Sequence, residues 1–234
     1  MKETIAFCGD SYCADIASQE LVSWPDLIAN VLNIKIVSRG VKGTPFYSAY
    51  KQVNRAIDLE INYIIICITH YSRLANLYDL SVMPNRTPWD ERKSYESLIR
   101  MVGSAEKAKE INLACKLYYE YLYKDEYHAT VQKLFIESLD SRLLEHKKKV
   151  IWFHCDENSL SIPIKSGPCL NSSLYDVSIA ELEPGEKFSD EEDKRRNHCN
   201  SENNQNMANL ILDVIKNDSF TARLIRTQDY FLNV

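Results

Sequence analysis

Tyr63-Ile64-Ile65-Ile66-Cys67-Ile68 is the strongest strand signal in the chain. A near-continuous apolar run of this kind predicts a strand that is covered on both faces, which is the environment of a strand inside a parallel sheet. It therefore favours an α/β fold, in which helices lie on both sides of the sheet. The segments before and after this run test that interpretation.

Short β-rich runs alternate with helical stretches on both sides of this strand, as in parallel βαβ units. We predict a doubly wound, flavodoxin-like α/β fold: a parallel sheet of about five strands with helices on both faces, in a single domain spanning residues 1–234. The predicted strands are Thr4–Phe7, Lys35–Val37, Tyr63–Ile68, Val150–His154 and a short one near Val177–Leu182. The predicted flanking helices are Trp24–Leu32, Phe46–Leu59 and Ser201–Lys216.

The segment Ser94–His146 has no strand signal, and its apolar residues recur at helical spacing. We predict two or three helices that enlarge one crossover connection. Five tyrosines cluster within it: Tyr118, Tyr119, Tyr121, Tyr123 and Tyr127. They fit either a helix packed on the sheet with hydroxyls at its rim or a substrate-lining role. In both cases we expect the insertion to pass near the strand ends.

Composition excludes several classes of function. The net charge of −5 and the lack of clustered Lys and Arg argue against nucleic-acid binding. No run of 18 apolar residues predicts a membrane span, and the first residues do not resemble a signal peptide. The seven cysteines are scattered without a Cys-x-x-Cys pair, which favours free thiols in a cytoplasmic protein over a disulfide framework or a zinc site. We expect no metal and no cofactor.

The first strand ends in Phe7-Cys8-Gly9-Asp10-Ser11. Gly-Asp-Ser after an N-terminal strand resembles the first block of the SGNH, or GDSL-like, hydrolase family. The resemblance implies that Ser11 is the nucleophile and that its backbone N–H contributes to the oxyanion hole, with Asp10 beside it in the pocket. Ligands of open parallel sheets bind at the carboxyl ends of the strands, where this turn would present the serine.

The second strand is followed by Ser38-Arg39-Gly40-Val41-Lys42-Gly43, which is similar to the family's second block, although Ser38 stands where asparagine is common. The resemblance implies that Gly43 supplies a second oxyanion N–H and that Gly40 lines the pocket. A glycine lacks Cβ, so its backbone can approach a substrate carbonyl closely.

The third block departs from the family pattern. The family has Gly-x-Asn-Asp after the third strand, whereas this chain has Thr69-His70-Tyr71-Ser72-Arg73. The asparagine that would donate to the oxyanion is therefore absent or replaced. Thr69, Ser72 and Arg73 can donate hydrogen bonds, and His70 follows a central strand, so all four are candidate pocket residues.

The run His198-Cys199-Asn200-Ser201, followed by an apolar helical face, resembles the family's last block. The resemblance implies that His198 is the general base that takes the serine proton. The family's acid lies three residues before the histidine, and this position is Arg195, which cannot accept a hydrogen bond. We expect Asp193 or a main-chain carbonyl to orient His198, with Asp193 slightly favoured.

Three functional hypotheses follow. The first is a serine hydrolase that cleaves an ester or acyl bond of a small molecule or a glycan through a Ser–His pair; an acyltransferase would use the same residues. The second is a binding module of the same fold that has lost catalysis, since the third block and the usual acid are missing. The third, a nucleotide-binding domain, needs a phosphate-binding loop that the chain lacks. The sequence does not indicate an oligomeric state.

Overall fold

The computed structural model describes residues 2–14, 22–75, 92–154, 162–174, 199, 201–226 and 229–230, with the backbone alone for residues 92–95 and 97. It contains a six-stranded sheet of order β2-β1-β3-β4-β5-β6. Every neighbouring pair of strands is parallel. The strands are β1 (Thr4–Cys8), β2 (Lys35–Ser38), β3 (Tyr63–Ile68), β4 (Lys149–His154), β5 (Cys169–Ser173) and β6 (Leu224–Ile225).

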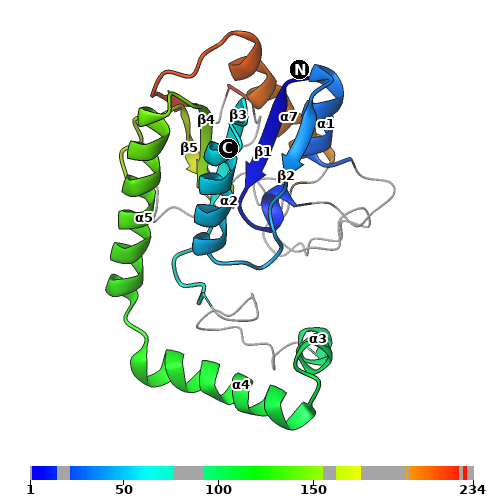
Figure 1. Cartoon of the computed structure of the whole chain (residues 1–234), viewed down its shortest axis with the longest axis vertical. Coiled ribbons are helices and arrows are strands. Elements are labelled where there is room, and N and C mark those ends of the chain that lie inside the picture. The colour runs from blue at the N-terminus through cyan, green and yellow to red at the C-terminus, as the bar shows by residue number, and fades with distance from the viewer. Residues whose placement is uncertain are drawn as a thin grey trace.

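Helices cover both faces of this sheet (Figure 1). The helices are η1 (Ser11–Cys13), α1 (Trp24–Leu32), α2 (Phe46–Asp58), α3 (Arg92–Val102), α4 (Ala105–Leu117), η3 (Tyr118–Leu122), α5 (Asp125–Glu145) and α7 (Ser201–Lys216). The strand order and the two helical layers confirm the predicted doubly wound, flavodoxin-like α/β fold.

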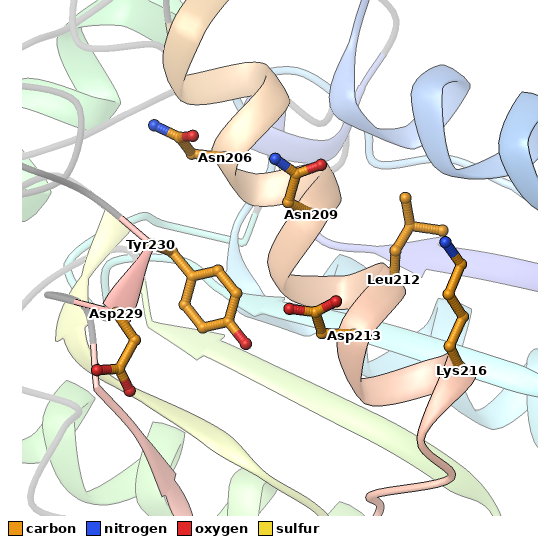
Figure 2. A pocket seen from close by; sticks show the side chains of 7 residues that line it. All are labelled: Asn206, Asn209, Leu212, Asp213, Lys216, Asp229 and Tyr230. Carbon is orange, nitrogen blue, oxygen red and sulfur yellow. The ribbon is translucent and has the colours of Figure 1, made fainter.

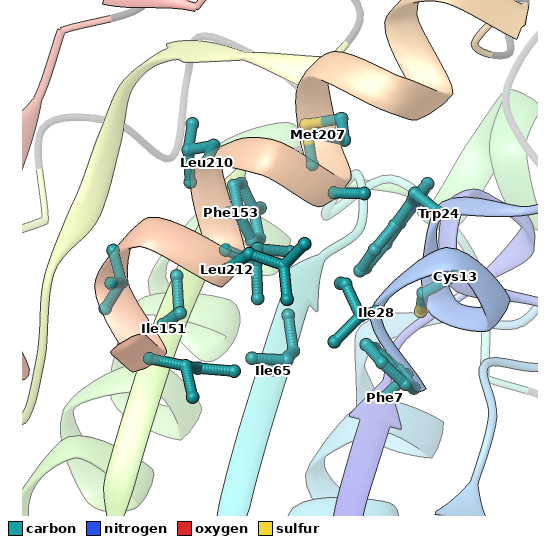
Figure 3. Close-up of a cluster of buried hydrophobic side chains, with 14 of the residues drawn as sticks. Phe7, Cys13, Trp24, Ile28, Ile65, Ile151, Phe153, Met207, Leu210 and Leu212 are labelled. Carbon is teal, nitrogen blue, oxygen red and sulfur yellow. The ribbon is translucent and has the colours of Figure 1, made fainter. Parts of the chain in front are cut away.

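One face of the sheet is covered by α1 and α7. Phe7 and Ile65 from the strands pack with Trp24 of α1 and with Met207 and Leu210 of α7 (Figure 3). Trp24 is almost completely buried, and its ring meets that of Phe7 edge-on at 5.2 Å between centroids. Burying a side chain of this size contributes about 2–3 kcal/mol. The contact fixes the start of α1 close to the end of β1.

The opposite face is covered by α2 and α5. Ile64 and Ile66 of β3 pack against Val53 of α2 and Leu139 of α5. Side chains of a strand alternate between faces, so β3, whose six residues are all buried, serves both cores at once. This accounts for the uninterrupted apolar run from which the fold class was predicted.

The order of the strands creates a switch point between β1 and β3. The chain leaves β1 through α1 to reach β2 on one side, then crosses back through α2 to β3 on the other side. Because the two connections pass on opposite faces, their loops separate at the carboxyl ends of β1 and β3. Ligands of this fold bind in that crevice.

The predicted helical insertion contains α3, α4, η3 and α5 between β3 and β4. In Figure 1, α4 lies beyond the end of the sheet to which the arrowhead of β1 points. The segment η3 is a π-helical turn, closed by a 2.7 Å bond from Tyr123 N–H to the Tyr118 carbonyl. Such turns are rare and occur often at functional sites.

The sheet differs from the expectation at its far edge. The strand expected near Val177–Leu182 lies outside the described residues. The fifth strand is β5, whose sequence Cys-Leu-Asn-Ser-Ser has little apolar character, and the sixth is only two residues long. Both take their place by pairing with a neighbour already in the sheet, a long-range effect that a local pattern does not reveal.

Candidate functional site

Ser11 lies on a tight turn at the carboxyl end of β1. Asp10 caps the short helix η1, and its Oδ1 accepts a 3.1 Å hydrogen bond from the N–H of Tyr12. Ser11 is the first residue of that helix and is partly exposed, whereas Asp10 is completely buried. The turn therefore points one polar side chain inward and leaves the serine accessible.

The loop after β2 is bonded directly to this turn. Gly40 N–H donates to the Cys13 carbonyl and Val41 N–H donates to the Gly9 carbonyl, both at 3.0 Å. A Cβ on Gly40 would stand 2.5 Å from Cys13 Sγ and closer still to the Asp10 carbonyl oxygen. Gly40 is thus required for backbone contact between two loops, a more specific reason than the pocket lining predicted for it.

Gln52 of α2 forms hydrogen bonds with both of these loops. Its Oε1 accepts from Gly9 N–H and its Nε2 donates to the Arg39 carbonyl, each at 2.9 Å. A single amide side chain thus satisfies one backbone group in each loop. This residue gave no signal in the sequence, because only the fold brings residue 52 to the end of β1.

Gly43, the second predicted oxyanion donor, has a φ of +74°, in the left-handed region that favours glycine. Among the residues that the structure describes, none accepts a hydrogen bond from its N–H. The next residue, Thr44, is buried, and its hydroxyl donates to the Val41 carbonyl at 2.8 Å. Gly43 therefore lies in an ordered turn, and its role as an oxyanion donor stays a prediction.

The loop after β3 brings Arg73 to Asp10. Arg73 Nη1 lies 2.7 Å from Asp10 Oδ2 and 3.2 Å from the Thr44 carbonyl oxygen. One guanidinium group thus contacts the loops after β1 and β2 while belonging to the loop after β3. The ion pair crosses the switch point, and it occupies the place where the family pattern has its third block.

The other third-block candidates have local or buried roles. His70 Nδ1 accepts from the N–H of Ser72 at 3.1 Å and lies 2.6 Å from Ser72 Oγ. The His70 ring also stacks on Tyr71 with 4.6 Å between centroids. Thr69 and Ser72 are both buried. These contacts shape the loop that presents Arg73.

The helical insertion contacts this same loop. Tyr119 of η3 donates from its hydroxyl to the Ser72 carbonyl at 2.6 Å, and Gln132 of α5 donates to the Thr69 carbonyl at 2.8 Å. Burial raises the pKa of the Tyr119 phenol, so it remains a donor at neutral pH. The insertion therefore contacts the sheet at the edge where Ser11 lies. Its predicted role as a wall of the pocket stays a prediction.

His198 and Asp193 lie outside the described residues, but the residue after His198 is placed. Cys199 is buried in the core beneath α1 and α7. Its carbonyl accepts a 2.8 Å bond from Asn204 Nδ2, and Asn204 Oδ1 accepts a 2.9 Å bond from Trp24 N–H. The Trp24 indole N–H in turn donates to the Tyr12 carbonyl at 2.8 Å. Three hydrogen bonds thus connect the neighbour of Ser11 to the neighbour of His198.

His154 is a titratable residue at this edge that the sequence analysis did not select. It ends β4 and pairs in register with Ile68 and Ser173. Burial lowers its pKa to about 4, so it is neutral at neutral pH. Since Trp152 packs toward α2 and α5, alternation along the strand places His154 on that face too. The signal that could have identified His154 in the sequence is its position at the end of an apolar run.

A separate hollow of about 380 Å³ lies along α7 (Figure 2). It is lined by Asn206, Asn209, Leu212, Asp213, Lys216, Asp229 and Tyr230. None of the predicted site residues contributes to this lining. Burial and the nearby Asp213 carboxylate raise the pKa of the Tyr230 phenol. We assign the candidate site to the switch point, where the polar loops converge.

Within the described ranges, no group of three His, Cys, Asp or Glu side chains is arranged to hold a metal ion. The described helices likewise include none that is long and apolar enough to cross a membrane. No protein-family model matches the chain, and no curated protein matches it at a significant level. The case for a function therefore depends on the residues at the switch point.

Proposed function

We propose that this protein is a serine hydrolase that cleaves an ester or acyl bond. Ser11 attacks the carbonyl carbon, and His198 takes the serine proton and passes it to the leaving group as the scissile bond breaks. Water then attacks the acyl-Ser11 ester, gives a proton to His198 and releases the acid, and His198 returns the proton to Ser11. The N–H groups of Ser11 and Gly43 bind the oxyanion in both steps. Serine needs such a base because its hydroxyl is a weak nucleophile at its ordinary pKa.

The observation that most supports this proposal is the hydrogen-bonded chain from Tyr12 through Trp24 and Asn204 to Cys199. Ser11 precedes Tyr12 and His198 precedes Cys199 in the sequence. A Ser–His pair needs the two side chains within about 3 Å. These hydrogen bonds connect Tyr12 to Cys199 at the same end of one core, although the two residues lie near opposite ends of the sequence.

The geometry of the turn supports the proposal independently. Ser11 is partly exposed at the switch point, and the Gly43 N–H has no acceptor among the described residues. Backbone hydrogen bonds join the loop after β1 to the loop after β2. Donors that are held in place before the reaction stabilise the developing oxyanion at little reorganisation cost.

Two partners for His198 remain in the proposal. Asp193 is the nearest acid before the histidine, and a main-chain carbonyl could fill the same role in a Ser–His dyad. Either would accept a hydrogen bond from the N–H of one ring nitrogen and so leave the other nitrogen unprotonated and able to receive the proton of Ser11.

The substrate class proposed is a small-molecule or glycan acyl ester, and the location proposed is the cytoplasm. The location is supported by the cysteines: the six that the structure describes are all free thiols, and all are buried. Buried free thiols suit a reducing compartment.

The test is turnover of a panel of small acyl esters, such as 4-nitrophenyl acetate and butyrate and an acetylated sugar, by the unaltered protein and by Ser11→Ala. The proposal predicts hydrolysis that depends on Ser11. A matched control is Ser141→Ala, because Ser141 is exposed on α5 and bonds only to its own helix. Equal turnover in Ser11→Ala and the unaltered protein would contradict the assignment.

A second candidate is a binding module of the same fold without catalysis. It is favoured by one observation: the loop after β3 presents Arg73, already paired with Asp10, where the family has an oxyanion-binding asparagine. Saturable binding of an acyl ester, with no turnover and no reaction of Ser11 with a fluorophosphonate, would establish this function instead.

A further inference from the structure

We propose that Arg73 is a positioning residue for Ser11, and that it acts through its ion pair with Asp10. The inference deepens the proposed function and depends on it. Arg73 itself does not touch the reacting atoms in this proposal. It replaces the missing third-block asparagine by a different physical route, which is to hold the nucleophile turn and the oxyanion loop in register.

The charge of Asp10 makes a cation necessary. Asp10 is completely buried and precedes the nucleophile directly. A buried carboxylate is costly unless it is paired and hydrogen-bonded. It would also oppose the negative charge that develops on the substrate oxygen beside Ser11. Arg73 Nη1, at 2.7 Å, neutralises that carboxylate at close range.

The same guanidinium reaches the loop of the second oxyanion donor. Arg73 Nη1 contacts the carbonyl oxygen of Thr44, the residue that follows Gly43. Asp10 adjoins Ser11 on the other side. The two groups that Arg73 contacts are therefore the immediate chain neighbours of the two proposed oxyanion donors, so its position sets the spacing between them.

The geometry of the Arg73–Asp10 contact is not the one that would contribute most to the stability of the fold. Arg73 Nε is buried without a hydrogen-bond partner among the described residues, although Nη1 lies 2.7 Å from Asp10 Oδ2. A bidentate arginine–carboxylate pair that used Nε would satisfy more of the guanidinium N–H donors. A buried donor without a partner costs about 1–3 kcal/mol. An unsatisfied buried group in a native protein calls for an explanation, and a functional arrangement is one such explanation.

The helical insertion forms hydrogen bonds with the loop that contains Arg73. Tyr119 bonds the carbonyl of Ser72, which directly precedes Arg73, and Gln132 bonds the carbonyl of Thr69. The π-helical turn that contains Tyr119 directs its hydroxyl to this loop. The insertion and the nucleophile are thus connected through one short path, Tyr119 to Ser72 to Arg73 to Asp10.

The experiment compares the rate at which Ser11 reacts with a fluorophosphonate in Arg73→Met, Asp10→Asn and the double variant. We expect Arg73→Met to lower that rate about 100-fold, the effect of a displacement near 1 Å in a catalytic group. The double variant should react about tenfold faster than Arg73→Met, because it lacks the unpaired buried carboxylate. Equal rates in Arg73→Met and the unaltered protein, or strictly additive effects, would overturn the inference.

Arg142→Met is the matched control. Arg142 of α5 also forms an Arg–Asp pair of 2.7 Å, with Asp58, although this pair is more exposed than the pair of Arg73 and Asp10. Among the described residues, Arg142 forms no hydrogen bond with any of the three loops. Its loss should leave the labelling rate unchanged. A rate lowered as much as in Arg73→Met would show that removing any such pair slows the reaction, and would contradict a specific role for Arg73.

A chemical rescue separates positioning from folding. Millimolar guanidinium should restore part of the labelling rate of Arg73→Ala, whereas urea, which has the same shape without the charge, should not. Equal effects of the two solutes would contradict the electrostatic role. If the Arg73 variants do not fold, Tyr119→Phe keeps the ring, removes the hydroxyl that bonds to the Ser72 carbonyl, and should slow labelling about tenfold; an unchanged rate there would overturn the inference. Absence of labelling in the unaltered protein would instead reject the proposed function, and this inference with it.

Discussion

Asn204 accepts a 2.9 Å hydrogen bond from the backbone N–H of Trp24, a residue 180 positions away in the sequence. The bond joins α7 to the first turn of α1, and the other end of the same side chain holds the carbonyl of Cys199. Asn204 is buried, and both polar ends of its amide are therefore satisfied by backbone groups of two distant segments. Because the Trp24 indole also bonds to the Tyr12 carbonyl, this amide and Trp24 together connect the neighbours of the proposed nucleophile and its base.

Replacing Asn204 by leucine should affect both stability and reactivity. The change leaves the Trp24 amide and the Cys199 carbonyl without partners, at a cost of about 1–3 kcal/mol each in the free energy of unfolding. The segment before α7 would also lose its bond to α1, so the labelling rate of Ser11 should fall. Urea titration and the labelling rate measure the two effects. Asn209→Leu is the control, since Asn209 is exposed on the same helix; equal losses in both variants would contradict the assigned role.

Much of the sheet could be predicted because its strands have local signals. β1, β3 and β4 are short apolar runs that become buried on both faces, and the breaks at Gly9 and Gly40 mark where loops begin. β5 could not be predicted, because Asn171, Ser172 and Ser173 lack strand character and are held by pairing with β4. Periodicity reports local structure, while pairing partners are set by the whole fold.

Part of the candidate site could likewise be predicted from the sequence, and part of it is brought together only by the fold. The turn at Asp10 and Ser11 follows from a strand ending in Gly-Asp-Ser, and Gly43 from a glycine after the second strand. The partner of Asp10 is Arg73, which is remote in sequence and becomes adjacent only when β3 pairs with β1. Gln52 was missed for the same reason. A buried aspartate does predict a cation in principle, but the sequence does not say which one.

His154 makes a prediction about stability and pH. Burial lowers its pKa to about 4, whereas an unfolded histidine titrates near 6.5. As the pH falls below about 6.5, the unfolded chain takes up the proton first, so this residue lowers the free energy of unfolding progressively until about pH 4. The full effect is about 3 kcal/mol.

We expect His154→Leu to reduce the loss of stability between about pH 7 and pH 4.5, measured as the change in urea midpoint. The difference between variant and unaltered protein isolates this residue from the carboxylates that also titrate in that range. His146→Leu serves as the control because His146 is exposed at the end of α5. An identical pH dependence in His154→Leu and the unaltered protein would show that His154 is not buried as a neutral side chain.

Asp193 separates the triad from the dyad. If its carboxylate orients His198, Asp193→Asn should lower the turnover rate of an acyl ester by several orders of magnitude, as loss of a triad acid does. If a main-chain carbonyl has that role, turnover should stay near that of the unaltered protein. Asp190→Asn is the matched control from the same acidic stretch and should have little effect. A loss of the same size in both variants would indicate a role for the charge of the stretch and reject Asp193 as the specific partner.

The central claim is that Ser11 is an activated nucleophile with His198 as its base. The most direct measurement is the reaction of the unaltered protein with a fluorophosphonate, with the modified residue identified by mass spectrometry of the peptides. We predict one adduct, on Ser11, formed much more slowly in His198→Ala and at a rate that rises with pH through the ordinary titration range of histidine, near 6.5. An adduct on another residue, no adduct at all, or an unchanged rate in His198→Ala would contradict the claim.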